Sequence, residues 1–381
     1  MLDVIFVFCC VMIIYPYILY PIIVKALGLI RNRQINISSH IPTITFVISA
    51  FNEEEVIEEK IRNTLALNYP KEKLEIIVVS DHSTDRTDEI VTSFAKDGVL
   101  LLSRDVRRGK TAGLNDAVDK AVGDMIVFSD ADSMYEVDAL KKMAGYLSGN
   151  PSVGLVTGST HYRSKTAGKI VVTTSMYMKL ESFIKRQESN LNSCVGADGA
   201  IFAVRKTLYQ RLQHDEINDL VIPLNVIHQG YRVVFHPDLH CFEAPAADAM
   251  GEFKRQVRIT NRTLRAIFRN AELMNIFKYP LFGFELISHK LLRFIVPFFM
   301  LVLFFVNLLL LGKETIYYVT LAAQMIVYSL SIIRYWQERR GREGKLLNIF
   351  YHFVMVNASI IGGWINFLNG NKSVMWNPQK Q

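Results

Sequence analysis

The stretch that decides the fold is IVFSDAD, residues 126–132, in which a short apolar run ends in two aspartates. Such a run, bounded by polar residues, predicts a buried strand, and burial of both faces is typical of a parallel sheet. Asp130 and Asp132 then lie at the carboxyl end of that strand, where open α/β sheets bind ligands. Two carboxylates suit Mg²⁺ or Mn²⁺, which complete their coordination with substrate phosphates. An Asp-x-Asp pattern alone is common by chance, so its meaning depends on the surrounding chain.

Hydrophobic residues gather at the two ends of this chain, and positive charge lies beside them. The 381 residues carry a net charge of +7, and 50% of them are hydrophobic. Lysine and arginine next to apolar segments favour a membrane, and not nucleic acid, as the partner surface. The four cysteines form no Cys-x-x-Cys pair, so neither a zinc site nor a redox site is indicated.

The apolar ends predict four membrane-spanning helices. Residues 4–24 are apolar apart from their tyrosines and are long enough to cross a bilayer. Three further spans are predicted at residues 291–311, 316–333 and 346–368. Basic residues follow the first span and fill residues 334–345, and positive clusters face the cytoplasm. We therefore expect a multi-pass protein of the plasma (inner) membrane, with both termini outside and the central region in the cytoplasm.

The central region alternates strand and helix patterns. Strands are predicted at residues 43–49 and 74–80, separated by a helix that starts after Asn52 and the acidic residues up to Glu54. This βαβ order implies a parallel sheet and an α/β fold. The predicted division is a transmembrane helix with its basic flank at 1–33, an α/β domain at 34–270, an interfacial helix at 271–290 and a membrane region at 291–381.

Two further polar residues of this domain, Asp81 and Lys110, lie where a ligand can bind. Asp81 ends the strand at 74–80, where a carboxylate can accept a hydrogen bond from a nucleobase or a ribose hydroxyl. It can equally be an N-cap or turn carboxylate. Lys110 belongs to a cation-rich loop before a helix, which attracts phosphate, although a solvated basic loop has the same composition.

The second half of the domain offers a glycine-rich loop and a further carboxylate as candidate site residues. Gly196, Asp198 and Gly199 lie in a glycine-rich loop, and glycine lets backbone approach a ligand closely. A structural turn at Gly199 and a capping role for Asp198 are the alternatives. Asp219 begins the next predicted helix, where a carboxylate can cap the helix.

A helix at residues 253–265 carries arginines at three- and four-residue spacing, so they share one face. Arg258 and Arg262 on this face can bind a diphosphate, because guanidinium grips phosphate oxygens in pairs. The alternative is a face that lies against anionic lipid headgroups.

The ordered motifs resemble those of family 2 glycosyltransferases over residues 43–265. They are Asn52-Glu53-Glu54, Ser80-Asp81-His82-Ser83-Thr84-Asp85, Gly109-Lys110-x-x-Gly113-Leu114-Asn115, Asp130-Ala131-Asp132 and Asn218-Asp219. The resemblance implies a Rossmann-like GT-A fold with a mainly parallel sheet. It also implies donor binding by Asn52, Glu54, Asp81, Lys110, Asp130, Arg258 and Arg262, a metal at Asp130 and Asp132, acceptor binding by Gly196, Asp198 and Gly199, and catalysis by Asp219.

The activity implied by this resemblance is inverting transfer of a sugar from a UDP-linked or similar donor to a lipid-linked or growing polysaccharide acceptor. One alternative is a processive synthase that extrudes its product. Ile259 stands where polymer-making members have tryptophan, and Arg255 stands where they have glutamine, which argues against this alternative. A second alternative is a non-catalytic nucleotide-binding subunit of a polysaccharide assembly.

Overall fold

The computed structural model describes all residues except 32, 167–168, 174–175, 245–248, 341–346 and 373–381. By their contacts, the residues divide into two compact units. One unit comprises 23–247 and 268–285 and contains the sheet, while the other comprises 1–22, 248–267 and 286–372 and contains most of the apolar helices. The boundary therefore differs from the one predicted at residue 270, because most of the arginine-rich helix clusters with the apolar helices.

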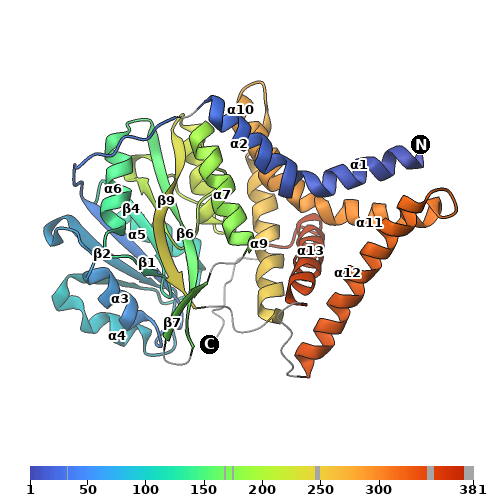
Figure 1. The fold of residues 1–381 in the computed structure, drawn as a ribbon. Coiled ribbons are helices and arrows are strands. Elements are labelled where there is room, and N and C mark those ends of the chain that lie inside the picture. The colour runs from blue at the N-terminus through green and yellow to red at the C-terminus, as the bar shows by residue number, and fades with distance from the viewer. Residues whose placement is uncertain (32, 167–168, 174–175, 245–248, 341–346, 373–381) are drawn as a thin grey trace. The chain divides into compact units, whose positions relative to one another are not determined.

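The sheet unit is built on a nine-stranded sheet with the order β3-β2-β1-β4-β8-β6-β9-β5, and β7 pairs with β6. Strands β3, β2, β1 and β4 run parallel to one another, and β8 is antiparallel to both β4 and β6. The strands are β1 (Ile44–Ala50), β2 (Leu74–Ser80), β3 (Val99–Ser103), β4 (Met125–Asp130), β5 (Met134–Tyr135), β6 (Val153–Thr166), β7 (Lys169–Thr173), β8 (Phe202–Arg205) and β9 (Arg232–Glu243). The parallel half confirms the predicted α/β architecture (Figure 1).

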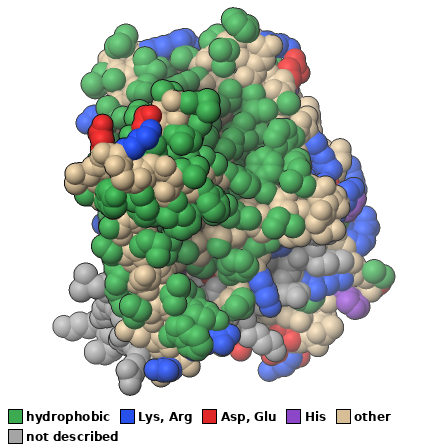
Figure 2. All heavy atoms as spheres, turned by 90° about the vertical axis from the view of Figure 1, so that its right-hand side faces the viewer, with side chains coloured by type: hydrophobic (Ala, Val, Ile, Leu, Met, Phe, Trp, Pro, Cys, Tyr) green, Lys and Arg blue, Asp and Glu red, His purple; other side chains and the backbone are tan. Residues whose placement is uncertain are grey.

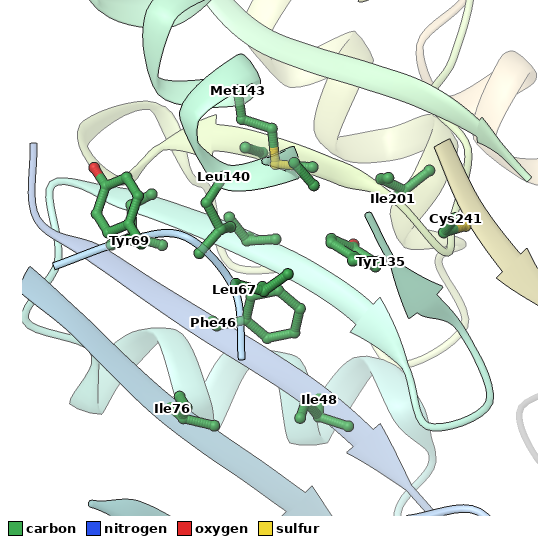
Figure 3. Close-up of a cluster of buried hydrophobic side chains, with 14 of the residues drawn as sticks. Phe46, Ile48, Leu67, Tyr69, Ile76, Tyr135, Leu140, Met143, Ile201 and Cys241 are labelled. Carbon is green, nitrogen blue, oxygen red and sulfur yellow. The ribbon is translucent and has the colours of Figure 1, made fainter. Parts of the chain in front are cut away.

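Helices cover both faces of this sheet because its central strands are apolar on both sides. Every residue of β1 is buried. Phe46 and Ile48 of β1 pack with Leu140 and Met143 of α6 in one buried cluster (Figure 3). The opposite face receives α5, in which Gly113 lies so near Val79 that a Cβ at this glycine would come within 2.7 Å of it. The helices are α3 (Ile57–Leu65), α4 (Thr87–Ser93), α5 (Lys110–Lys120), α6 (Ala139–Gly149), α7 (Met176–Leu191) and α8 (Asn218–His228).

Strand β9 pairs with a strand that is distant in sequence. Gly230 (φ +83°) makes the turn after α8, and β9 then runs for 12 residues beside β6, parallel to it. A local sequence pattern cannot reveal such a partner.

The second unit contains helices long and apolar enough to cross a membrane. Four such stretches are found among the described residues, Leu2–Ile30, Pro280–Leu310, Thr315–Arg339 and Asn348–Leu368. They match the four predicted spans, although the second begins within the range expected to be an interfacial helix. The elements of these stretches, together with the arginine-rich helix, are α1 (Leu2–Ile14), η1 (Tyr15–Leu19), α2 (Tyr20–Ile30), α9 (Ala249–Arg269), α10 (Pro280–Glu285), η6 (Leu286–Leu291), α11 (Leu292–Leu310), α12 (Thr315–Arg339) and α13 (Asn348–Leu368). By their contacts, α10 and most of α2 belong to the sheet unit.

Large hydrophobic side chains remain exposed on these helices. Val4 and Phe8 of α1, Phe305 of α11 and Ile326 of α12 are each at least half exposed. Figure 2 shows a face that hydrophobic side chains cover over much of its area. Continuous exposed apolar surface is too costly to leave in water, so these helices are suited to a bilayer.

Candidate active site

The two aspartates predicted to hold a metal lie at the carboxyl end of β4, as expected. Asp130 is the last residue of β4, and Lys110 at the start of α5 donates a hydrogen bond to Asp130 Oδ1. Burial, and next the charge of Asp130, raise the pKa of the Asp132 carboxyl. A divalent cation bound by both side chains would remove this repulsion, so the donor set fits Mg²⁺ or Mn²⁺.

Two glutamates that sequence reasoning did not assign to the site lie near these aspartates. Burial and then the charge of Asp132 raise the pKa of Glu53, after β1, and of Glu243, at the end of β9, each to about 8. Glu243 accepts a hydrogen bond from Ser133 Oγ at 2.6 Å. Among the described residues, no group of three or more His, Cys, Asp or Glu side chains is arranged to hold a metal ion.

Lys60 of α3 is a second feature that the sequence analysis missed. Its side chain is fully buried, and burial lowers the pKa of its ammonium to about 7. The sequence signal was available, because Lys60 stands at helical spacing from Ile57, Ile61 and Thr64, which are also buried. A lysine on the apolar face of a helix must find polar partners inside the protein.

The Asp81 carboxylate binds the basic loop of the protein itself. Oδ1 accepts a hydrogen bond from the Arg108 amide at 2.9 Å, and Oδ2 accepts one from the Gly109 amide at 2.7 Å. Arg104 also donates to Oδ1, at 3.3 Å. Gly109 has φ +88°, a backbone conformation that favours glycine. Asp81 thus fixes the loop that leads to Lys110, and donor binding by Asp81 remains a prediction.

Asn52 and Glu54 join the loops that follow β1 and β2. Asn52 has φ +54°, and its Oδ1 accepts a hydrogen bond from the Thr84 amide at 2.8 Å. Glu54 Oε2 accepts one from the Arg86 amide at 3.1 Å. These bonds hold the two loops together at the carboxyl end of the sheet, so direct donor binding by Asn52 or Glu54 remains a prediction.

The glycine-rich loop and the candidate base lie side by side. The Ala197 amide donates to the Asp219 carbonyl at 2.7 Å, and a Cβ on Gly199 would lie 3.2 Å from Asp219 Oδ2. Gly196 has φ +81° and makes the turn before this contact. Asp198 accepts hydrogen bonds from the amide and hydroxyl of Thr160, both at 2.9 Å. The carboxylate of Asp219 therefore lies against the backbone of Gly199, which carries no side chain.

Residues next to Lys110 and next to Asp219 are in contact with each other. Thr111, next to Lys110, donates to the Glu216 carbonyl at 2.8 Å, just before α8 and Asp219. The charge of Asp198 also contributes to the raised pKa of Glu243. The candidate residues of the sheet unit thus lie along one edge of the sheet.

Arg258 and Arg262 lie on α9 within the other unit, and their donor-binding role remains a prediction. The final residue of α9, Arg269, belongs to the sheet unit and binds both carboxylate oxygens of Asp215, each at 2.8 Å. This ion pair anchors the loop that leads to α8.

Replacing Gly199 with alanine is expected to lower kcat about tenfold and to leave the donor KM unchanged, because the new methyl displaces the Asp219 carboxylate by a few tenths of an ångström. Gly28→Ala is the matched control, since the nearest atom to its Cβ would lie 3.6 Å away. Steady-state kinetics of purified protein measure the effect. An unchanged kcat would show that this close approach has no catalytic importance.

Comparison with known families agrees with this geometry. Residues 45–212 match the sequence model described as Glycosyl transferase family 2. This part of the chain is therefore similar to family 2 glycosyltransferases, and the fold is of the GT-A type. The match ends before Asp219.

Among curated relatives, the poly-beta-1,6-N-acetyl-D-glucosamine synthase of Staphylococcus aureus (strain COL) is 26% identical over 245 residues, which are 63% of this chain and 59% of that protein. The synthase of the same name from Staphylococcus epidermidis is 26% identical over 235 residues, 60% of this chain and 57% of its own. The matched part thus spans less than two thirds of these relatives.

Among solved structures, the mannosyltransferase PcManGT from Pyrobaculum calidifontis, in complex with GDP-Man and Mn²⁺, aligns with a TM-score of 0.77 at 20% identity. The alignment covers 97% of this chain and 99% of that chain. At this identity, the likeness concerns the fold alone.

Proposed function

We propose that the protein is an inverting glycosyltransferase of the membrane. It would transfer a sugar from a nucleotide-sugar donor, UDP-linked in our preferred version, to a lipid-linked or growing polysaccharide acceptor. The observation that carries this proposal is the edge of the sheet where Asp130, Asp132 and Lys110 lie within the part of the chain that is similar to family 2 glycosyltransferases, with Asp219 against Gly199 beyond them.

Asp130 and Asp132 would hold Mg²⁺ or Mn²⁺, which would neutralise charge on the donor diphosphate and on the departing nucleotide. Lys110 is paired with Asp130 and can turn to a phosphate oxygen once the aspartate binds the ion. Asp81 would act indirectly, by fixing the loop that presents Lys110. Arg258 and Arg262 are proposed as further diphosphate ligands.

Asp219 would act as general base. It accepts the proton of the acceptor hydroxyl while that oxygen bonds to the anomeric carbon of the donor, and the bond from this carbon to the nucleotide breaks on the opposite face. Because attack and departure occur on opposite faces, the configuration inverts and no protein nucleophile is needed. Gly199 and the neighbouring loop would leave room for the acceptor beside the base.

The four candidate spans favour an acceptor that is itself held in the membrane. Basic residues beside the spans support a cytoplasmic sheet unit. A processive synthase is the second candidate, because the two Staphylococcus relatives are named polysaccharide synthases. Ile259, where polymer-making members have tryptophan, weighs against it.

The proposal is tested by incubating the purified full chain in detergent with Mn²⁺, a panel of nucleotide sugars and a lipid-phosphate acceptor, and measuring nucleotide release and product. We expect release from one nucleotide class that depends on acceptor. Product chains of many sugars from a single purified protein would favour the processive synthase. Nucleotide binding without any turnover would favour a non-catalytic subunit.

A further inference from the structure

Lys60 lies directly behind the turn that carries the two metal-binding aspartates. Its Nζ donates a hydrogen bond to Ser129 Oγ at 2.7 Å and another to the Ser133 carbonyl. Ser129 and Ser133 are the residues on either side of Asp130-Ala131-Asp132. One ammonium group therefore joins the two ends of this turn from the inside of the protein.

The environment of Lys60 fixes its position. Its side chain has no exposed area, and Nζ lies 4.3 Å from the centre of the Tyr135 ring and 5.0 Å from that of Phe46. Among the described residues, no carboxylate lies within 4.0 Å of Nζ to form an ion pair. The ammonium is thus held by two hydrogen bonds and two aromatic faces, and its positive charge acts on the turn without occupying a carboxylate oxygen.

The far side of the turn is restrained as well. The Ser133 carbonyl accepts the hydrogen bond from Lys60, and the Ser133 hydroxyl donates a hydrogen bond to Glu243 Oε1 at 2.6 Å. Tyr135, beneath the ammonium, donates to the Phe128 and Ala200 carbonyls at 3.1 and 2.8 Å. A turn held at both ends by buried groups keeps its two carboxylates in one arrangement before an ion binds.

We infer that Lys60 is a positioning residue for the metal site, which sets the geometry of Asp130 and Asp132 and thereby the affinity for the divalent cation and donor diphosphate. This inference rests on the proposed function, because it takes those aspartates as the metal ligands. Partners behind metal ligands typically alter metal affinity by about 10- to 100-fold when they are removed.

The test replaces Lys60 with methionine, which keeps the apolar stem and removes the ammonium. Mn²⁺ binding to the purified full chain is measured by the electron paramagnetic resonance signal of free Mn²⁺, with and without UDP. We expect Lys60→Met to weaken Mn²⁺ binding by about tenfold or more. An unchanged or tighter affinity overturns the inference, and a tighter one would show that only charge repulsion had been removed.

Lys73→Met is the matched control. Lys73 also donates from Nζ to a backbone carbonyl, that of Ile41 at 2.7 Å, but it lies just before β2, at the opposite end of that strand from Asp81. Both variants are expected to lower Tm, whereas only Lys60→Met should weaken Mn²⁺ binding. Equal effects of the two variants on Mn²⁺ affinity would indicate a general loss of stability and overturn the inference.

Ser129→Ala provides a second variant, should Lys60→Met fold poorly. It removes one of the two hydrogen bonds and leaves the lysine in place, so about a fivefold loss of Mn²⁺ affinity is expected. Unchanged Mn²⁺ affinity in Ser129→Ala would also contradict the inference. Failure of the unmodified protein to bind Mn²⁺, by contrast, would refute the proposed metal site itself.

Discussion

Replacing Asp219 with asparagine is expected to lower sugar transfer about a thousandfold while donor binding stays unchanged. Asparagine keeps the shape of the side chain but cannot accept the proton of the acceptor hydroxyl. Loss of a general base typically lowers the reaction rate by about 10²- to 10⁴-fold, and the expected effect lies within this range. Asp219 lies against Gly199 at the start of α8 and is not one of the two carboxylates at the end of β4, so donor binding should be unchanged.

Two measurements are needed for this variant: single-turnover transfer at saturating donor, and the Kd for nucleotide diphosphate with Mn²⁺. Asp119→Asn is the matched control, because Asp119 is an exposed carboxylate on α5 that pairs with Arg211. The control should transfer sugar at the normal rate. Transfer by Asp219→Asn within a few fold of normal would mean that another group accepts the proton.

Much of this site could be predicted from the sequence because its residues follow strands whose apolar runs are unambiguous. Asp81 and Asp130 lie where the strand pattern indicated, at the carboxyl ends of β2 and β4. In a parallel sheet the carboxyl ends of neighbouring strands meet at one edge, so two correct strand ends were enough to bring these carboxylates to the same region.

The rest depends on packing that local pattern does not encode. Glu243 reaches the site because β9 pairs with β6, a strand distant in sequence, and its position follows from strand order. The role of Asp81 was ambiguous for a different reason. Its carboxylate accepts from two loop amides, and only the backbone conformation around Gly109 decides that these amides point toward it.

Lys60 shows a third limit. Periodicity places it on the buried face of α3, and a sequence reader expects an apolar residue there. A buried charge in such a position requires partners, but these are the two ends of a turn, at Ser129 and Ser133, which are 69 and 73 residues away in the sequence. The helix pattern could therefore have identified Lys60 as unusual without identifying what it contacts.

Replacing Asp132 with asparagine is expected to abolish Mn²⁺-dependent donor binding, with a loss of affinity of at least about a hundredfold. This loss is larger than the one expected when a residue that only positions the metal ligands is replaced. The variant removes one of two carboxylates at the end of β4, and a neutral amide attracts a hard divalent cation far less. The raised pKa of Asp132, caused by burial and then by Asp130, indicates that the two charges repel until a cation binds.

Calorimetric titration of the purified chain with UDP, in the presence of Mn²⁺ and again with excess chelator, measures this effect. The normal protein should lose UDP affinity when Mn²⁺ is removed, and Asp132→Asn should already show the weak value with Mn²⁺ present. Asp138→Asn is the matched control, since Asp138 precedes α6 and its carboxylate accepts a hydrogen bond from the exposed Asn68 side chain at 2.8 Å. Because Asp219→Asn is expected to bind donor but not transfer, and Asp132→Asn to bind neither ion nor donor well, the pair separates the base from the metal site. Normal Mn²⁺-dependent binding by Asp132→Asn would place the ion on other ligands, and the acidic residues nearest to the turn, Glu53 and Glu243, would then be the first to replace.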